Sequence, residues 1–260
     1  MSARHLRLEA VENFRDFGGY HTADGRRMKS GHFYRSASHG RATDADLEAI
    51  EALGLALIVD LRRPAERGRD PARRPAGFAG QVLVNDHEES HDDDPWWNFV
   101  KSCDLSEAAF RAYLLDYYRN APFVPRHVDL FARYFRALAD ADGPVLIHCA
   151  AGKDRTGVLA ALTHRVAGVH DDDIVEDFLL TNSPERMAAR APMLGQMIVE
   201  ATGKTPSEEA LRTIMGVEAA YLAEAFRAIE AEHGSVDAYL AAALGVDAAL
   251  REALEARLLA

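Results

Sequence analysis

Residues 144–157 read PVLIHCAAGKDRTG, an apolar run followed by a loop of small residues and then, at 158–166, a helical pattern. This order predicts a strand, a tight loop and the first turn of a helix. The backbone N–H groups of such a loop point inward, and the helix N-terminus adds its partial positive charge. The segment therefore predicts an anion-binding loop at the carboxyl end of a buried strand.

Two side chains of this loop carry the expected chemistry. Cys149 stands six positions before Arg155. The positive field of the loop stabilises a thiolate, so we expect Cys149 to be nucleophilic at neutral pH. Arg155 has a planar set of donors that matches two oxygens of a phosphate. The pattern predicts hydrolysis of phosphate esters through a phosphocysteine intermediate, with both residues catalytic and with no metal or other cofactor.

The other loop residues are predicted to bind the substrate phosphate or to shape the loop. The backbone N–H groups stabilise the equatorial oxygens, Gly152 permits the turn, and the hydroxyl of Thr156 can donate to the sulfur. Lys153 either adds a second positive charge, suited to multiply charged head groups, or faces solvent. Gly157 is expected to let the helix pack close to the sheet. The predicted substrate-binding residues are Ala150, Ala151, Gly152, Lys153, Thr156 and Gly157.

Strands and helices alternate along the first two thirds of the chain, which predicts an α/β fold with a central sheet flanked by helices. Ligands of such sheets bind at the carboxyl ends of the strands, where both Cys149 and Asp60 are expected to lie. The expected elements are an extended region at 13–35 with a type I′ turn at Asp24-Gly25, a helix from Thr43 to Gly54, strands at 55–61, 81–84 and 144–148, and helices at 105–119 and 125–140.

No strand is expected after residue 168, where the pattern becomes helical. The expected helices are 171–181, 184–201, 206–216, 217–233 and 235–259. No flexible linker separates the two parts. We therefore expect a single domain over residues 1–260, with an α/β core at about 13–182 and a helical C-terminal extension at about 183–260.

Composition narrows the class of protein. The net charge of -11 argues against a nucleic-acid partner, and no apolar stretch approaches the roughly 18 residues of a membrane span. The N-terminal residues contain no apolar core of a secretory signal, although export without a leader stays open. With only two cysteines, Cys103 and Cys149, a disulfide framework is not expected. A catalytic thiol suits the reducing cytoplasm.

The loop also resembles a known signature. His-Cys, five residues, Arg-Thr is similar to the signature of cysteine-dependent phosphatases, and AGKDRTG at 151–157 resembles the bacterial tyrosine phosphatases that include secreted mycobacterial and listerial enzymes. NFRDFGGY at 13–20, YRS at 34–36 and DLR at 60–62 extend the resemblance over 13–182. It implies a tyrosine-phosphatase-like core and metal-free hydrolysis. The implied partner is a phosphorylated protein or, in some members, a phosphoinositide.

Two aspartates, Asp60 and Asp154, are candidates for the general acid. A leaving group needs a proton from a positioned carboxylic acid, and a carboxyl beside a bound dianion keeps its proton more readily. Asp154 lies within the loop and resembles the Asp-Arg-Thr ending of myotubularin-type and Sac-type lipid phosphatases; otherwise it pairs with an arginine or caps the helix. Asp60 resembles the acid proposed for the bacterial family; otherwise it is a structural carboxylate. Asp154 is preferred, and both are predicted catalytic residues.

Two charged segments have open interpretations. Six arginines at 62–74 would steer anionic substrates if they border the site, or else form a solvated face. In the acidic segment 86–97, His87 and His91 have the spacing of zinc ligands on a helix, but the aspartates and a proline favour a loop. Trp96 or Trp97 would close over the substrate as a flap, or simply pack at the surface.

Two other classes of protein compete with a phosphatase. A rhodanese-type sulfurtransferase also uses a cysteine loop to bind anions, but its loop normally lacks Arg-Thr-Gly at the helix start. An inactive phosphate-binding module would recruit phosphorylated partners. The presence of Cys149, Asp154 and Arg155 together argues against that module.

Overall fold

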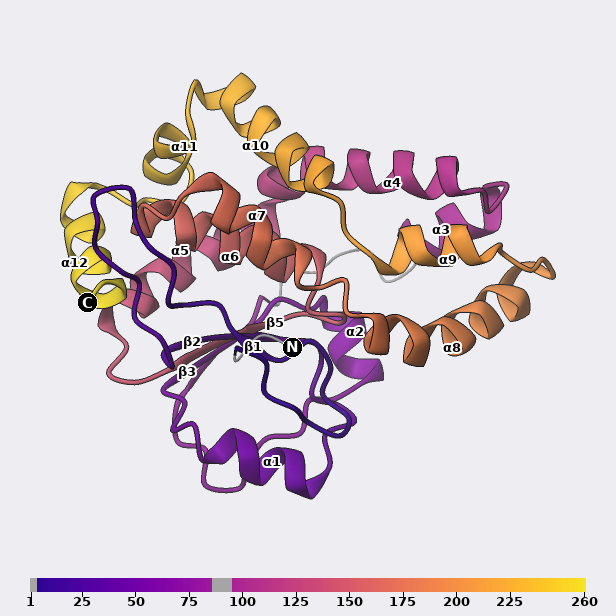
Figure 1. Cartoon of the computed structure of the whole chain (residues 1–260), viewed down its shortest axis with the longest axis horizontal. Helices are drawn as coiled ribbons and strands as arrows, with labels where there is room; N and C mark the ends of the chain where they lie inside the picture. The colour runs from indigo at the N-terminus through magenta and orange to yellow at the C-terminus, as the bar shows by residue number, and fades with distance from the viewer. Residues whose placement is uncertain (1–3, 86–94) are drawn as a thin grey trace.

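A computed structural model describes residues 4–85 and 95–260 and has a five-stranded sheet at its centre (Figure 1). The strand order is β1-β2-β5-β3-β4, in which β1 runs antiparallel to β2 and the other neighbours are parallel. The strands are β1 (Arg15–Asp16), β2 (Phe33–Ser36), β3 (Leu57–Asp60), β4 (Gln81–Leu83) and β5 (Val145–His148). Because β5 lies between β2 and β3, the residues that follow it emerge at the centre of the sheet.

Both faces of the sheet are buried, which explains the continuous apolar runs of its strands. Ile58 and Leu146 face a small apolar cluster that includes Ile50 of helix α1 (Asp44–Glu51). Val59 and Ile147 face the large cluster, which continues into the C-terminal helices. In Figure 1, α1 covers one side of the sheet and most other helices cover the opposite side. This confirms the predicted α/β class.

The helices agree with most of the predicted ranges. They are α1 (Asp44–Glu51), α2 (Pro64–Arg69), α3 (Pro95–Ser102), α4 (Glu107–Asn120), α5 (Pro125–Asp140), α6 (Asp154–Ala167), α7 (Asp171–Leu179), α8 (Pro184–Thr202), α9 (Glu208–Met215), α10 (Ala219–His233), α11 (Val236–Ala242) and α12 (Ala248–Leu258), with a 3₁₀ turn η1 (Ala121–Phe123). The side chain of Thr43 accepts a hydrogen bond from Asp46 N, as its predicted role of N-cap requires.

Two local expectations were wrong, and two short helices were missed. The predicted helix at 235–259 is two helices, because Gly245 takes a φ of +68° between α11 and α12. The short helices α2 and α3 were not predicted, since neither has a long apolar repeat. The chain does turn at Asp24-Gly25, but only Gly25 has a positive φ, so the turn is not type I′.

The C-terminal helices pack back onto the rest of the chain. Helix α12 contacts α5 and α6, α10 contacts α4, and the backbone N–H of Lys29 donates to Leu258 O at 2.8 Å. Helices α8 and α9 form an arm beside α3 and α4 (Figure 1). Within the two described ranges, no helix is both long and apolar enough to cross a bilayer.

Candidate active site

The loop between β5 and α6 lies where the sequence predicts it. Cys149 follows the last residue of β5 and is 2% exposed, and α6 begins at Asp154. Gly152 has a φ of +63°, and a Cβ there would lie 2.4 Å from the carbonyl carbon of Ser36. Only glycine combines that backbone conformation with so close an approach of β2. The curvature of the loop is therefore fixed at Gly152.

The guanidinium of Arg155 is held by α2. It donates to Glu66 Oε2 at 2.5 Å, to Glu66 Oε1 at 2.8 Å and to Leu61 O at 3.1 Å. Burial would lower the pKa of Arg155, but the charges of Glu66 and Cys149 and the hydrogen bonds of Glu66 raise it well above its usual value. Arg155 is thus a fixed cation that interacts electrostatically with the cysteine.

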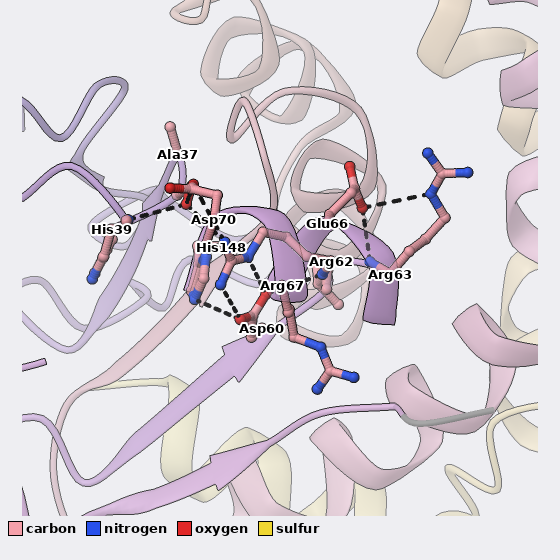
Figure 2. Close-up of polar contacts among 12 residues, drawn as sticks. Ala37, His39, Asp60, Arg62, Arg63, Glu66, Arg67, Asp70 and His148 are labelled. Carbon is pink, nitrogen blue, oxygen red and sulfur yellow. Dashed lines mark hydrogen bonds and ion pairs between the residues drawn. The ribbon is translucent and has the colours of Figure 1, made fainter. Parts of the chain in front are cut away.

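Glu66 is a site residue that the sequence reasoning missed. Burial would raise the pKa of Glu66, but the charge and hydrogen bonds of Arg155 lower it, so this carboxylate is ionised. Its Oε2 also accepts from the backbone N of Arg63 at 2.7 Å, which caps α2 (Figure 2). A signal was present: Pro64 at the first helical position and glutamate two residues later are typical of a helix start.

Buried charges support the other side of the loop. Gly152 O accepts from Asn13 Nδ2 at 2.7 Å and from Arg35 Nη2 at 3.2 Å. Arg35 and Arg15 both pair with Asp177 of α7, at 2.6 and 3.1 Å. Burial would raise the pKa of Asp177, but the two arginines lower it. Asn13 and Arg35, from the segments at 13–20 and 34–36, therefore bind the loop directly, and Asp177, which no motif identified, holds Arg35 and Arg15 in place.

Asp60 is fully engaged at the end of β3. Arg62 donates from Nε to Asp60 Oδ1 at 2.9 Å and from Nη2 to Oδ2 at 2.8 Å, and Arg62 N donates to Oδ1 at 3.1 Å. His148 Nε2 lies 3.8 Å from Oδ2 (Figure 2). Burial would raise the pKa of Asp60, but His148 and Arg62 lower it to about 2. With a side chain 1% exposed, Asp60 is an ionised, buried carboxylate.

Asp154 has different surroundings. Tyr118 of α4 donates to Asp154 Oδ1 at 2.9 Å, and Lys153 Nζ lies 3.5 Å from the same oxygen. Within the described parts of the chain, Oδ2 accepts no hydrogen bond. The side chain is 23% exposed. Asp154 therefore keeps one carboxyl oxygen without a hydrogen bond from a described residue, at a partly exposed position at the start of α6.

The side chain of Lys153 has partners other than those expected. Its Nζ donates to Ile214 O at 2.6 Å and to Gly216 O at 3.1 Å, at the C-terminal end of α9. The residue is 4% exposed. Lys153 thus neither faces solvent nor directs its ammonium at the centre of the loop, although its backbone remains part of the loop.

Two further loop residues differ in detail from expectation. Thr156 Oγ1 is buried and has no hydrogen-bond partner among the described residues, so the expected bond to the sulfur is not formed in this structure. A Cβ at Gly157 would lie 2.7 Å from the Phe178 ring. The same point lies 3.5 Å from Arg35 Nη2 of β2, so the glycine allows a close approach of α7 as well as the expected packing toward the sheet.

The arginines at 62–74 are largely tied to protein groups. Arg62 binds Asp60, Arg67 donates to a backbone carbonyl oxygen, and Arg73 pairs with a carboxylate at 2.6 Å. These contacts give the three arginines a structural role. They do not support the hypothesis of a loop that steers substrates.

Residues 86–94 of the acidic segment lie outside the described residues, and α3 begins at Pro95. The interpretation of His87 and His91 as zinc ligands concerns these residues and stays a prediction, and the described residues contain no cluster that could hold a metal. Trp96 and Trp97 lie in the first turn of α3, so the loop favoured for this segment is wrong at 95–97. The Trp96 ring stacks on Phe110 with centroids 5.9 Å apart, which supports packing and not a flap for this residue.

A cysteine at the carboxyl end of a central parallel strand, a glycine loop and an arginine in the next helical turn together define a cysteine-dependent phosphatase. The sequence bears this out: residues 6–260 match the tyrosine phosphatase family, and the chain belongs to it. The match confirms the resemblance seen in the loop. It also covers the C-terminal helices, for which no motif was found.

Named relatives agree with the family. The chain is 36% identical to a protein of Cupriavidus necator named as a tyrosine-protein phosphatase, over 96% of this chain and 88% of that protein. It is 31% identical to the triple specificity protein phosphatase PtpB of Mycobacterium tuberculosis, over 90% and 91%. A tyrosine-protein phosphatase of Nostoc commune is 33% identical over 57% of this chain and 48% of its own length. The protein is therefore a phosphoric monoester hydrolase that acts on phosphorylated substrates.

Proposed function

We propose that Cys149 is the nucleophile, that Arg155 and the loop N–H groups bind the phosphate, and that Asp154 is the general acid. The assignment of the acid rests on the difference in hydrogen bonding between the carboxyl oxygens of Asp60 and Asp154. Both oxygens of Asp60 are occupied by Arg62, whereas Asp154 Oδ2 accepts no hydrogen bond from a described residue. A general acid must hold a proton and present it to the leaving group.

The pKa of Asp60 supports the same assignment. A carboxyl with a pKa of about 2 is ionised across the neutral range and has no proton to give. Protonating it would also disrupt a buried ion pair with Arg62, which carries a large penalty. Asp60 thus belongs to the framework behind the loop, and its role is to fix Arg62 and the end of β3.

The proposed reaction has two steps. In the first, the Cys149 sulfur forms a bond to phosphorus while the phosphorus–oxygen bond to the leaving group breaks, and Asp154 transfers its proton to the departing oxygen. In the second, Asp154 accepts a proton from a water whose oxygen bonds to phosphorus, and the sulfur–phosphorus bond breaks. Arg155 and the loop N–H groups stabilise the equatorial oxygens in both steps.

Matched substitutions test the acid. We expect Asp154→Asn to remove the basic limb of the pH–kcat profile and to slow phenyl phosphate about 10²-fold or more, with a smaller effect on p-nitrophenyl phosphate. Asp60→Asn should keep that limb. The reverse pattern would assign the acid to Asp60, and retention of the limb in both variants would exclude the two aspartates together.

We propose phosphotyrosine-type esters as the substrate class. In the sequence, Lys153 favoured a phosphoinositide head group. In the structure, its ammonium donates hydrogen bonds to the backbone carbonyls of Ile214 and Gly216. The relatives named tyrosine-protein phosphatases support the same choice. The mycobacterial relative is named for triple specificity, which supports a substrate range wider than one class.

A substrate panel tests this choice. Phosphotyrosyl peptides, phosphoseryl peptides and short-chain phosphoinositides are compared by kcat/KM, with chelator present throughout. We expect the phosphotyrosyl peptides to have the highest values. A phosphoinositide with the higher value would establish the alternative, a phosphoinositide phosphatase or a dual protein and lipid phosphatase.

Use of a reduced thiol supports a reducing compartment such as the cytoplasm, with phosphorylated proteins as partners.

A further inference from the structure

Asp154 is held through one oxygen only. Tyr118 Oη donates to Oδ1 at 2.9 Å and Lys153 Nζ lies 3.5 Å from Oδ1, so both donors approach the same edge of the carboxyl. Two donors on one oxygen draw negative charge to it. The proton of a carboxylic acid then resides on the other oxygen, Oδ2.

Tyr118 is rigidly placed. Its side chain is fully buried, its ring stacks on Tyr221 at 5.6 Å, and it meets Phe178 edge-on at 5.9 Å. Helices α10 and α7, which carry these two rings, thus flank the tyrosine that α4 supplies. The hydroxyl therefore has little freedom to leave Asp154, because three helices fix the ring that carries it.

Lys153 is fixed from the opposite side by the turn that joins α9 to α10. Its ammonium donates to Ile214 O and Gly216 O. The same turn is held by Arg186 of α8, which donates to Met215 O at 3.1 Å. Asn182 holds it too, donating to Val217 O and accepting from Val217 N, both at 2.8 Å. The position of the ammonium is thus set by the helical arm α8–α9.

From this geometry we infer that Tyr118 and Lys153 are positioning residues that orient Asp154 through Oδ1 and leave Oδ2 to the leaving group. This inference rests on the proposed role of Asp154 as general acid. Lys153 then acts through Asp154 and not on the substrate, and the C-terminal helices become part of the catalytic apparatus. They supply the carbonyl oxygens that hold the lysine.

Other charged and titratable groups surround Asp154 and must be considered in a pH experiment. Those that interact electrostatically with it are Tyr117 and Tyr118 of α4, Lys153 of the loop, Arg186 of α8 and Tyr221 of α10. Of these, only Tyr118 and Lys153 lie within 4 Å of an Asp154 oxygen by a hydrogen bond or ion pair in the described residues. Removal of either should therefore change the proton affinity of the acid directly.

The test is Tyr118→Phe, which keeps the stacked ring and removes only the hydroxyl. Loss of a donor to the carboxylate favours the protonated acid, so we expect the basic limb of the pH–kcat profile to move up by about one pH unit. The kcat for phenyl phosphate, a poor leaving group, should fall about 10-fold, and that for p-nitrophenyl phosphate by less than about 3-fold. Lys153→Met should move the limb in the same direction.

Tyr134→Phe is the matched control, because its buried hydroxyl contacts Thr163 at 3.0 Å and not the acid. This control should leave the limb in place. A Tyr118→Phe enzyme that loses kcat equally for both esters with an unmoved limb would overturn the inference. So would a Lys153→Met enzyme whose only change is a higher KM for multiply phosphorylated substrates. If Asp154→Asn keeps the basic limb, Asp154 is not the general acid. That result is distinct from one in which Asp154 is the acid but Tyr118 and Lys153 do not position it.

Discussion

The loops that follow β3 and β5 leave adjacent parallel strands, yet they use the same pair of residue types in opposite ways. At the end of β3, Asp60 and Arg62 form an ion pair with each other, and both side chains are 1% exposed. After β5, Asp154 and Arg155 turn apart: Arg155 pairs with Glu66, and Asp154 accepts from a tyrosine and stays 23% exposed. A pair that neutralises itself builds structure, whereas a pair kept apart retains the capacity to bind and to transfer a proton.

Local geometry explains the difference. Asp60 and Arg62 are two residues apart in extended chain, so their side chains leave the same face and meet. Asp154 and Arg155 are consecutive at the start of a helix, where neighbours point about 100° apart and do not face each other. The predictions below test whether the two loops divide structure and chemistry in this way.

The largest expected effect is the loss of the nucleophile in the loop after β5. Cys149→Ser should lower kcat on p-nitrophenyl phosphate by about 10⁴-fold or more, because a serine hydroxyl is not ionised at neutral pH. The wild-type rate should be unchanged by chelator. A rate that falls with chelator, or a serine variant that keeps most of its turnover, would contradict a thiolate mechanism.

The two arginines should respond differently to the same substitution. Arg155→Lys should lower kcat by about 10²–10³-fold, because an ammonium cannot reproduce the planar set of donors. Arg62→Lys should keep most of the turnover and lose stability instead. Steady-state kinetics and urea unfolding of both variants provide the measurement, and equal kinetic losses would remove the distinction between the loops.

The aspartate whose substitution affects activity less, Asp60, should be the one whose substitution lowers stability more. Asp60→Asn leaves the Arg62 guanidinium buried without its counter-charge and should lower the free energy of unfolding by about 3 kcal/mol. Asp154→Asn, at a partly exposed position, should lower it by less than about 1 kcal/mol. Denaturant titration at pH 7 measures both, and a stable Asp60→Asn protein would show that the first loop is not structural.

The smallest expected effect is a pH dependence of the free energy of unfolding, which arises from two buried histidines near the end of β3. His39 and His148 are buried and stacked at 4.9 Å, and burial lowers the pKa of both. Below pH 6.5 the unfolded chain binds protons that the folded chain does not. The free energy of unfolding should therefore decrease as the pH is lowered, by about 1 kcal/mol per histidine for each pH unit. Asp60 adds nothing in that window, since its lowered pKa matters only below about pH 4.

Urea unfolding at pH 7.5, 6.5 and 5.5 measures this slope. His39→Gln should flatten it, because one titrating group is removed from the stacked pair. A slope that is the same in the wild-type and His39→Gln proteins would show that His39 is protonated as readily when folded as when unfolded.

The sequence by itself determined the parts that depend on neighbours along the chain. The apolar run before Cys149, the glycine in the loop and the helix after it specify β5, the turn and α6, and Thr43 specifies the start of α1. Spacing was enough here, because strand burial, tight turns and helix caps act within a few residues. Helix α2 was missed because six residues with a glycine carry no apolar period.

Only the tertiary structure decided which groups face one another across the site. Glu66 meets Arg155 across 89 residues, Asp177 meets Arg35 across 142 and Tyr118 meets Asp154 across 36. No local pattern encodes such pairs, since their free energy comes from burial and charge pairing after the chain has closed. For the same reason the sequence supported only a preference for Asp154 over Asp60, and the fold distinguishes the two by giving Asp60 a complete set of partners and leaving one oxygen of Asp154 without a hydrogen bond from a described residue.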